Sequence, residues 1–160
     1  MLTNALFFHD PDKADGYLSN WYQVNFAING IVFSSVEQYM MYEKAMLFGD
    51  TAVAEEIMKN HEPNEIKQLG RQVKNYNDVV WKGMCQIIVY RGILEKFRQN
   101  EALKAQLIAT GDRILVKCVT DDKVWGNGTE LDEDERLDMS RWTGDNFLGF
   151  TLMCVRDALR

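Results

Sequence analysis

The segment Ser34–Phe48, which reads SSVEQYMMYEKAMLF, restricts the fold more than any other part of the chain. It predicts a helix that is apolar on almost every side, and such a helix is usually buried. The same segment carries an acid, Glu37, and a base, Lys44. Charged groups on a buried helix have to be paired, neutralised or directed into a cavity.

The spacing of the two charges places them on one stripe of that helix. Lys44 follows Glu37 by seven residues, and seven steps of ~100° return to within ~20° of the starting direction. A lysine that loses solvation there has a lowered pKa, and its free amine can attack a carbonyl carbon. A nearby carboxylate can move protons or stabilise a developing cation.

A structural explanation of the same two residues stands beside the functional one. Ser34 followed three residues later by Glu37 matches the capping box S-x-x-E, in which the carboxylate only satisfies a backbone N–H group. Lys44 would then extend its amine to solvent along an apolar surface. This segment alone does not decide between a functional pocket and a helix cap.

Length and composition predict one globular domain over residues 1–160. The chain has 160 residues, of which 46% are hydrophobic, and only two prolines. This is enough to bury a core. The chain has no low-complexity run, which argues against a linker. We expect a mainly α (α+β) fold, a single helical domain with a few short strands that include a β-hairpin.

Local signals predict where these elements lie. Asn29-Gly30 favours a hairpin over 24–33, because both residues tolerate a positive φ. The long helix that Asn77 opens has apolar residues at helical spacing and is expected to be the central core helix. These residues are Val80, Met84, Ile87, Ile88, Ile93 and Leu94. The other expected elements are a strand at Ala5–Phe8, helices after Asp50, Pro63 and Asn100, a buried strand over 114–119, and a last helix capped by Asn146.

Charge and cysteine content limit the compartment and the partners. A net charge of -6 disfavours non-specific binding to duplex DNA or to anionic membranes. No apolar stretch is long enough to span a bilayer, and residues 1–4 do not open a signal peptide. Three cysteines far apart favour reduced, buried thiols in a cytoplasmic protein, and neither histidine has metal-ligand spacing. These residues are Cys85, Cys118, Cys154, His9 and His61.

Several polar and aromatic residues are candidates for substrate binding. Asn20 could bind a polar ligand edge and Trp21 could stack on a base, although a turn residue and a core aromatic are the commoner explanation. Arg71 could hold a phosphate, or could simply complement the end of its helix. Trp81 could form a wall of a base pocket or belong to the core.

The segment after the predicted buried strand is a further candidate. Asp122, Trp125 and Gly126 follow the strand closely, and a glycine lets the backbone approach a ligand. A tight turn is the alternative. Asn146 opens the last helix, where free N–H groups can bind an anion or Asn146 can simply cap. The chain lacks the motifs G-x-S-x-G, P-loop, H-E-x-x-H and G-x-G-x-x-G, which argues against a serine hydrolase, an NTPase, a zinc protease and a Rossmann dehydrogenase.

The order of these motifs resembles the NADAR family, which includes the YbiA-like proteins. The resemblance covers nearly the whole chain and runs through LSNW, VEQY, EKA, LGR, Trp81, KFRQN, LIATGD, D-x-x-W-G-x-G, G-x-N-x-L-G and LMCVR. It implies a mainly helical domain that acts on N-glycosidic bonds at ribose C1. The implied substrates are phosphoribosyl aminopyrimidines of riboflavin synthesis or ADP-ribose attached to guanine, with no metal and no redox cofactor.

The resemblance also implies roles for individual residues. Glu37, Lys44, Asp122, Trp81 and Trp125 match positions that look functional in the family. We expect the first three to be catalytic and the remaining candidates to bind substrate. The latter are Asn20, Trp21, Arg71, Trp81, Trp125, Gly126 and Asn146. One departure bears on substrate choice, because relatives often carry a glutamate where this chain has Lys117.

Two other classes of protein fit the same residues. A module that binds ADP-ribose or NAD without catalysis would use the same pocket. A purely structural protein would use Glu37 as a cap and Lys44 as a surface lysine. We expect a small nucleotide-like substrate or an ADP-ribosylated guanine base as the partner, and the sequence does not indicate an oligomeric state.

Overall fold

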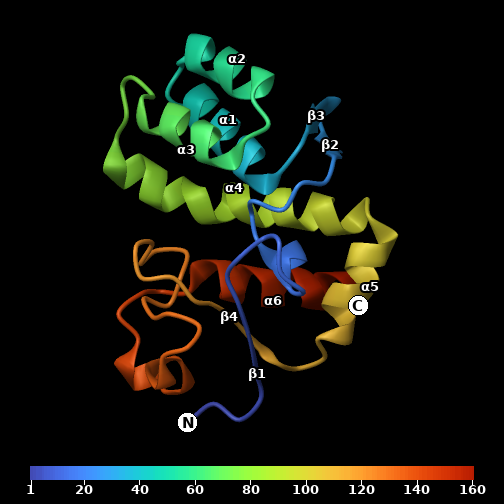
Figure 1. The fold of residues 1–160 in the computed structure, drawn as a ribbon. Coiled ribbons are helices and arrows are strands. Elements are labelled where there is room, and N and C mark those ends of the chain that lie inside the picture. Colours follow the sequence, from blue (N-terminus) through green and yellow to red (C-terminus); the bar gives the residue numbers. More distant parts are fainter. The chain divides into compact units, whose positions relative to one another are not determined.

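A computed structural model describes residues 1–160 and contains six α-helices and four short strands (Figure 1). The expected mainly helical fold with a few short strands is therefore confirmed. The chain divides into two compact units, residues 20–100 and residues 1–19 with 101–160. The single domain over 1–160 stays a prediction.

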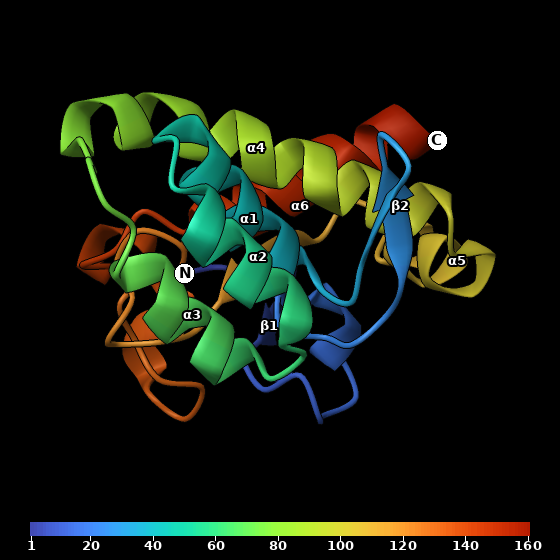
Figure 2. The same ribbon diagram turned by 90° about the horizontal axis from the view of Figure 1, so that it is seen from above.

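The unit of residues 20–100 is built around α1. Its elements are β2 (Phe26–Ile28), β3 (Ile31–Phe33), α1 (Val36–Leu47), α2 (Thr51–Lys59), α3 (Pro63–Arg71) and α4 (Asp78–Arg98). Helix α1 contacts α2, α3 and α4, and therefore forms the centre of this unit (Figure 2).

Local signals set most of the element boundaries in this unit. Asn29 and Gly30 have φ values of 52° and 80° and reverse the chain between β2 and β3, as the Asn-Gly pair predicts. The side chain of Asp50 accepts a hydrogen bond from the first turn of α2, and that of Asn77 does the same for α4. Pro63 occupies the first turn of α3.

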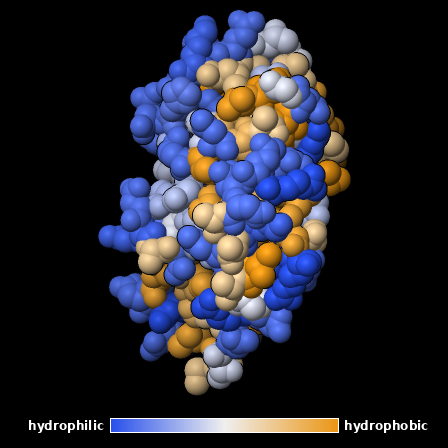
Figure 3. Space-filling model, turned by 90° about the vertical axis from the view of Figure 1, so that its right-hand side faces the viewer, coloured by the Kyte–Doolittle hydropathy of each residue, from blue (hydrophilic) through white to orange (hydrophobic).

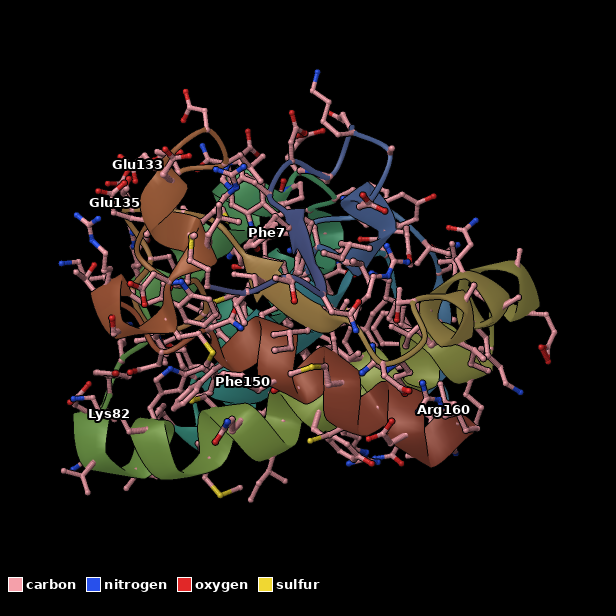
Figure 4. The ribbon with its side chains drawn as sticks, turned by 90° about the horizontal axis from the view of Figure 1, so that it is seen from below. Phe7, Lys82, Glu133, Glu135, Phe150 and Arg160 are labelled. Carbon is pink, nitrogen blue, oxygen red and sulfur yellow. The ribbon has the colours of Figure 1, made fainter.

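The expectation that α4 is the central core helix is wrong for its first half. Ile88 and Ile93 are buried, but Val80, Met84 and Ile87 are 43%, 37% and 63% exposed. The spacing of apolar residues identifies the faces of a helix and does not say which turns are covered. Since α1 takes the central place, the first turns of α4 reach solvent. Lys82 lies on these turns and points outward (Figure 4).

The other unit joins the two ends of the chain. Its elements are β1 (Ala5–Phe8), η1 (Gly16–Leu18), α5 (Glu101–Ala109), β4 (Ile114–Lys117), η2 (Asp134–Leu137), η3 (Met139–Arg141) and α6 (Phe147–Leu159). Strands β1 and β4 pair in parallel, with Ala5 opposite Ile114 and Phe8 opposite Lys117. Helix α5 and strand β4 both contact α6, which is the main packing element of this unit.

Polar residues are prominent on the parts of the surface seen in Figures 3 and 4. The acidic run after residue 129 is largely open, and Glu133 and Glu135 lie near each other at its outer edge (Figure 4). On the face seen in Figure 3, hydrophilic residues predominate and hydrophobic residues form small groups.

Cys85 and Cys118 are buried as expected, but Cys154 is exposed, which corrects that expectation. None of the helices combines the length and apolar character needed to cross a membrane.

One buried lysine has a consequence for stability. Lys96 on α4 is 1% exposed, and its amine lies 5.3 Å from the ring centroid of Tyr22 and 5.2 Å from that of Phe97. Burial lowers the pKa of Lys96 from 10.5 to about 7. Between these two values the unfolded chain binds more protons than the folded chain, so this residue makes the free energy of unfolding rise with pH.

We therefore expect that this contribution to the rise of the unfolding free energy with pH is absent from the variant Lys96→Met. As the pH increases from 7 to 10.5, the unfolding free energy of the natural chain should rise relative to that of the variant. The slope is at most about 1.4 kcal/mol per pH unit. Urea unfolding at several pH values measures it, and Lys13→Met, at an exposed lysine, is the control. A difference that stays constant with pH contradicts the lowered pKa.

Candidate active site

The amine of Lys44 occupies a defined position in the unit of residues 20–100. It donates a hydrogen bond of 2.8 Å to the carbonyl oxygen of Gly70, at the end of α3. It also lies over two aromatic rings, 4.6 Å from the centroid of Tyr76 and 5.5 Å from that of Trp81. Both distances are within the range of a cation–π interaction. The amine is thus held by one carbonyl group and two rings.

The surroundings of this amine favour its neutral form. Burial lowers the pKa of Lys44, the guanidinium of Arg71 lowers it further, and the carboxylate of Glu37 opposes both. Lys44 is half-buried, so a ligand can reach it. A lysine with a lowered pKa has a larger fraction of free amine at neutral pH and is a better nucleophile.

Glu37 is not the residue that caps α1. Helix α1 begins after Ser35, whose side chain accepts a hydrogen bond of 3.1 Å from the N–H of Gln38. The side-chain oxygen of Gln38 accepts in turn from the N–H of Ser34 at 2.8 Å. Ser35 and Gln38 thus take the place of the predicted pair Ser34 and Glu37, although the Gln38 side chain bonds to the N–H of Ser34, one residue before the N-cap. The structural explanation of Glu37 as a cap is wrong.

The carboxylate of Glu37 is 4% exposed in the first turn of α1. Its charge acts on Lys44, two turns further along the same helix, as the spacing predicts. Glu37 and Lys44 therefore form an electrostatically coupled acid and base on one helix.

Asn20 and Trp21 lie beside the start of α1. The carbonyl oxygen of Asn20 accepts a hydrogen bond of 2.9 Å from the N–H of Glu37. The side chain of Asn20 is 6% exposed, and its Oδ1 atom has no hydrogen-bond partner. Trp21 is half-buried, with the amine of Lys67 5.9 Å from its ring centroid. A buried polar atom without a partner suits a ligand contact.

Arg71 is the last residue of α3 and is exposed. Its guanidinium makes one long hydrogen bond, 3.5 Å to the side chain of Gln68. Its charge reaches Lys44, so the two cations border the same place. The unit of residues 20–100 thus brings Arg71 and Trp81 together with Lys44, and Asn20 with the first turn of α1.

The other predicted residues lie in a tight loop after β4. One oxygen of Asp122 accepts a hydrogen bond of 3.1 Å from the N–H of Trp125, and the other lies 3.6 Å from the amine of Lys117. The ring of Trp125 packs edge-on against Phe147 with 6.4 Å between centroids. These contacts agree with the turn that the sequence allowed, and a catalytic role for Asp122 stays a prediction.

Gly126 is required by packing in this loop. It is buried, its N–H donates 2.9 Å to the carbonyl oxygen of Asp122, and a Cβ atom there would overlap the side chain of Val119. The glycine thus allows the loop to close on the end of β4. Its predicted contact with a substrate stays a prediction.

Asn146 holds β4 against the start of α6. Its side chain accepts a hydrogen bond of 2.9 Å from the N–H of Lys117 and donates one of 3.0 Å to the carbonyl oxygen of Leu115. Its own backbone is left-handed, with φ 50°, and its side chain does not cap α6. The expected side-chain cap is wrong, because the amide is committed to the strand.

Sequence reasoning missed three groups at the site: Tyr76, the carbonyl of Gly70 and Lys67. Tyr76 stands in the loop just before α4, and only its position in space brings it to Lys44. Lys67 is four residues before Arg71, so the helical period could have placed both on one face of α3. No group of three or more His, Cys, Asp or Glu side chains has an arrangement that could hold a metal ion.

A family model and known proteins match this chain over most of its length. The model of the NADAR domain matches residues 6–160. The chain is 38% identical over 160 residues to "N-glycosidase R617" of Acanthamoeba polyphaga mimivirus, covering 95% of this chain and 94% of that protein. It is 28% identical over 160 residues to "Riboflavin biosynthesis protein VVA0006" of Vibrio vulnificus, but spans only 40% of that protein.

The fold also matches a solved structure. The NMR structure of the Escherichia coli protein YbiA superposes with a TM-score of 0.81 at 25% sequence identity. The match covers 99% of this chain and 86% of that chain. The mainly helical fold is thus shared with a solved relative.

The electrostatic couplings at Lys44 make two predictions of opposite sign. Arg71→Met should raise the pKa of Lys44, because it removes a neighbouring positive charge, and Glu37→Gln should lower it. NMR titration of the lysine side-chain signals measures both shifts. Glu65→Gln removes a charge from α3, the helix that carries Arg71, and serves as the control, because Glu65 is not among the charges that act on Lys44. Shifts of the same sign in both variants would contradict the described geometry.

The contacts of Asn146 predict a structural effect. Asn146→Ala leaves two backbone groups of β4 without their partner and places alanine in a left-handed conformation, so the unfolding free energy should fall by ~2–4 kcal/mol. Asn146→Gly avoids the strain of the left-handed backbone but still loses the two hydrogen bonds, so its unfolding free energy should fall by less. Denaturant unfolding measures both variants. A stable Asn146→Ala protein that no longer binds substrate would instead make Asn146 a ligand residue.

Proposed function

Because this chain belongs to the NADAR domain family, we propose that it is an N-glycosidase that hydrolyses a bond between ribose C1 and a nitrogen. The observation that carries the proposal is the amine of Lys44, which is hydrogen-bonded to Gly70 and lies over the rings of Tyr76 and Trp81. Its lowered pKa and its coupling to Glu37 give the site a nucleophile and a carboxylate.

Two substrates fit this proposal. One is a phosphoribosyl aminopyrimidine of riboflavin synthesis, which the name of the Vibrio vulnificus relative supports. The other is ADP-ribose attached to a guanine base. Both are anionic, nucleotide-like and small compared with duplex DNA. The net charge of -6 disfavours binding of duplex DNA. We place the reaction in the cytoplasm, with no membrane partner and no cofactor.

In one mechanism, water replaces the base directly. The C1–N bond breaks with its electron pair moving to the base nitrogen, which takes up a proton. Positive charge then develops at C1, as in other glycoside hydrolysis. The carboxylate of Glu37 stabilises that charge or accepts a proton from water as the water adds to C1.

In the other mechanism, Lys44 forms a covalent intermediate. The lone pair of the glycosidic nitrogen opens the ribose ring: the C1–O4 bond breaks, O4 keeps its electron pair and takes up a proton, and C1 becomes an iminium carbon. The neutral amine adds to C1, a proton passes from this amine to the glycosidic nitrogen, and the base leaves with the electron pair of the C1–N bond. The resulting Schiff base between Lys44 and C1 is then hydrolysed by water, which returns the amine and releases the sugar aldehyde. The lowered pKa of Lys44 supports this route.

The remaining residues bind and orient the substrate. We assign the base to the face of Trp81, the phosphate to Arg71, and a polar edge of the ligand to the unpartnered Oδ1 of Asn20. The catalytic role of Asp122 and the substrate contact of Trp125, both on the loop after β4, stay predictions.

Loss of either central group should abolish turnover. We expect Glu37→Gln and Lys44→Ala each to reduce the rate by ~100-fold or more, because each removes a group that acts on C1 in the transition state. Mass spectrometry after incubation with both substrates measures the products. Lys104→Ala, on α5, is the matched lysine control.

The outcomes separate the candidate functions. Full activity in both variants would end the assignment of the site. Tight binding of ADP-ribose without any product from either substrate would instead identify a non-catalytic module that binds ADP-ribose or NAD.

A further inference from the structure

Helix α3 presents two cations on one face. Lys67 and Arg71 are four residues apart, so their side chains project from neighbouring turns, ~6 Å apart along the axis. Neither forms an ion pair with a carboxylate, in contrast to most cations elsewhere on the helices. Like charges at this spacing repel each other, and an anionic ligand would offset that repulsion.

These cations border the site of Lys44. The carbonyl oxygen of Gly70, which holds the Lys44 amine, lies between them in the sequence of α3. Arg71 is the nearer one electrostatically, because its charge acts on Lys44. Three cations therefore follow one edge of the site in a chain whose net charge is -6. Such a local reversal of charge is typical of a site for an anion.

The end of this edge near Lys67 has two further features of a ligand site. The amine of Lys67 lies 5.9 Å from the ring centroid of Trp21, which is half-buried. The neighbouring residue Asn20 is 6% exposed and keeps a side-chain oxygen without a hydrogen-bond partner. An oxygen of this kind can accept from a hydroxyl or amino group of a ligand.

We propose that Lys67 and Trp21 form a second anion subsite, which selects a nucleoside diphosphate sugar over a sugar monophosphate. With C1 at Lys44, the phosphate nearest the ribose reaches Arg71. The outer phosphate then reaches Lys67, one turn back along α3, and the attached nucleoside reaches the ring of Trp21. A sugar monophosphate fills only the part at Arg71. This inference rests on the proposed function, because it places C1 at Lys44.

Binding of the two sugar products tests this subsite without any need for turnover. The probes are ADP-ribose and ribose 5-phosphate, measured by calorimetry. We expect the natural chain to bind ADP-ribose more tightly. Lys67→Gln should weaken ADP-ribose ~10-fold, since a charge-assisted contact is lost. It should leave ribose 5-phosphate within about twofold, and Lys67→Arg should keep most of the affinity.

Two control variants complete the test. Arg71→Gln should weaken both probes, and Lys104→Gln, a lysine of α5, should weaken neither. The inference is overturned if Lys67→Gln weakens both probes equally or neither. It is also overturned if the natural chain binds ADP-ribose no better than ribose 5-phosphate, or binds neither.

These results are distinguishable from a failure of the proposed function. Binding of ADP-ribose that depends on Lys67, without hydrolysis of either substrate, supports the subsite and contradicts the N-glycosidase. Hydrolysis with a Lys67→Gln variant that binds both sugars normally supports the N-glycosidase and contradicts the subsite.

Discussion

The hydrogen bond from the Lys44 amine to the Gly70 carbonyl, beneath Tyr76 and Trp81, is the contact on which the site depends. It fixes the amine between the end of α3 and the segment that starts α4. Partial burial penalises the positive charge, and Arg71 adds to that penalty. The carbonyl, the two rings and Glu37 offset it in part. The amine is therefore fixed in position, with a pKa below the ordinary value of a lysine.

Helix α1 can keep an acid and a base because other residues meet its structural needs. The side chain of Ser35 accepts from the N–H of Gln38, and the side chain of Gln38 accepts from the N–H of Ser34. The carboxylate of Glu37 is therefore not required as a cap. The first turns of α1 are buried, but its last turns open toward solvent, and Lys44 lies where that change occurs. Burial thus tunes Lys44 without isolating it from a substrate.

Features that depend on neighbouring residues could be predicted from the sequence. The turn at Asn29-Gly30 and the caps Asp50 and Asn77 need only interactions within a few residues. The common stripe of Glu37 and Lys44 follows from the helical period alone. The order of motifs predicted the family, and the NADAR model over residues 6–160 confirms it.

Features set by distant residues could not be predicted. Ser34 and Ser35 both fit a capping box, and only the observed start of α1 decides between them. Val80 is exposed because α1, rather than α4, lies at the centre of its unit. Asn146 looked like a cap, but its amide bonds to β4, some thirty residues earlier. The errors at Val80 and Asn146 have the same cause, since a local pattern does not contain the position of a remote partner.

A structure determined with bound ribose 5-phosphate would test the central claim most directly. We expect C1 of the sugar within ~3.5 Å of the Lys44 amine, or joined to it, with Glu37 on the same side of the ring. A sugar bound at another place, with the Lys44 amine still bonded to Gly70 and out of reach of C1, would contradict the assignment of this site.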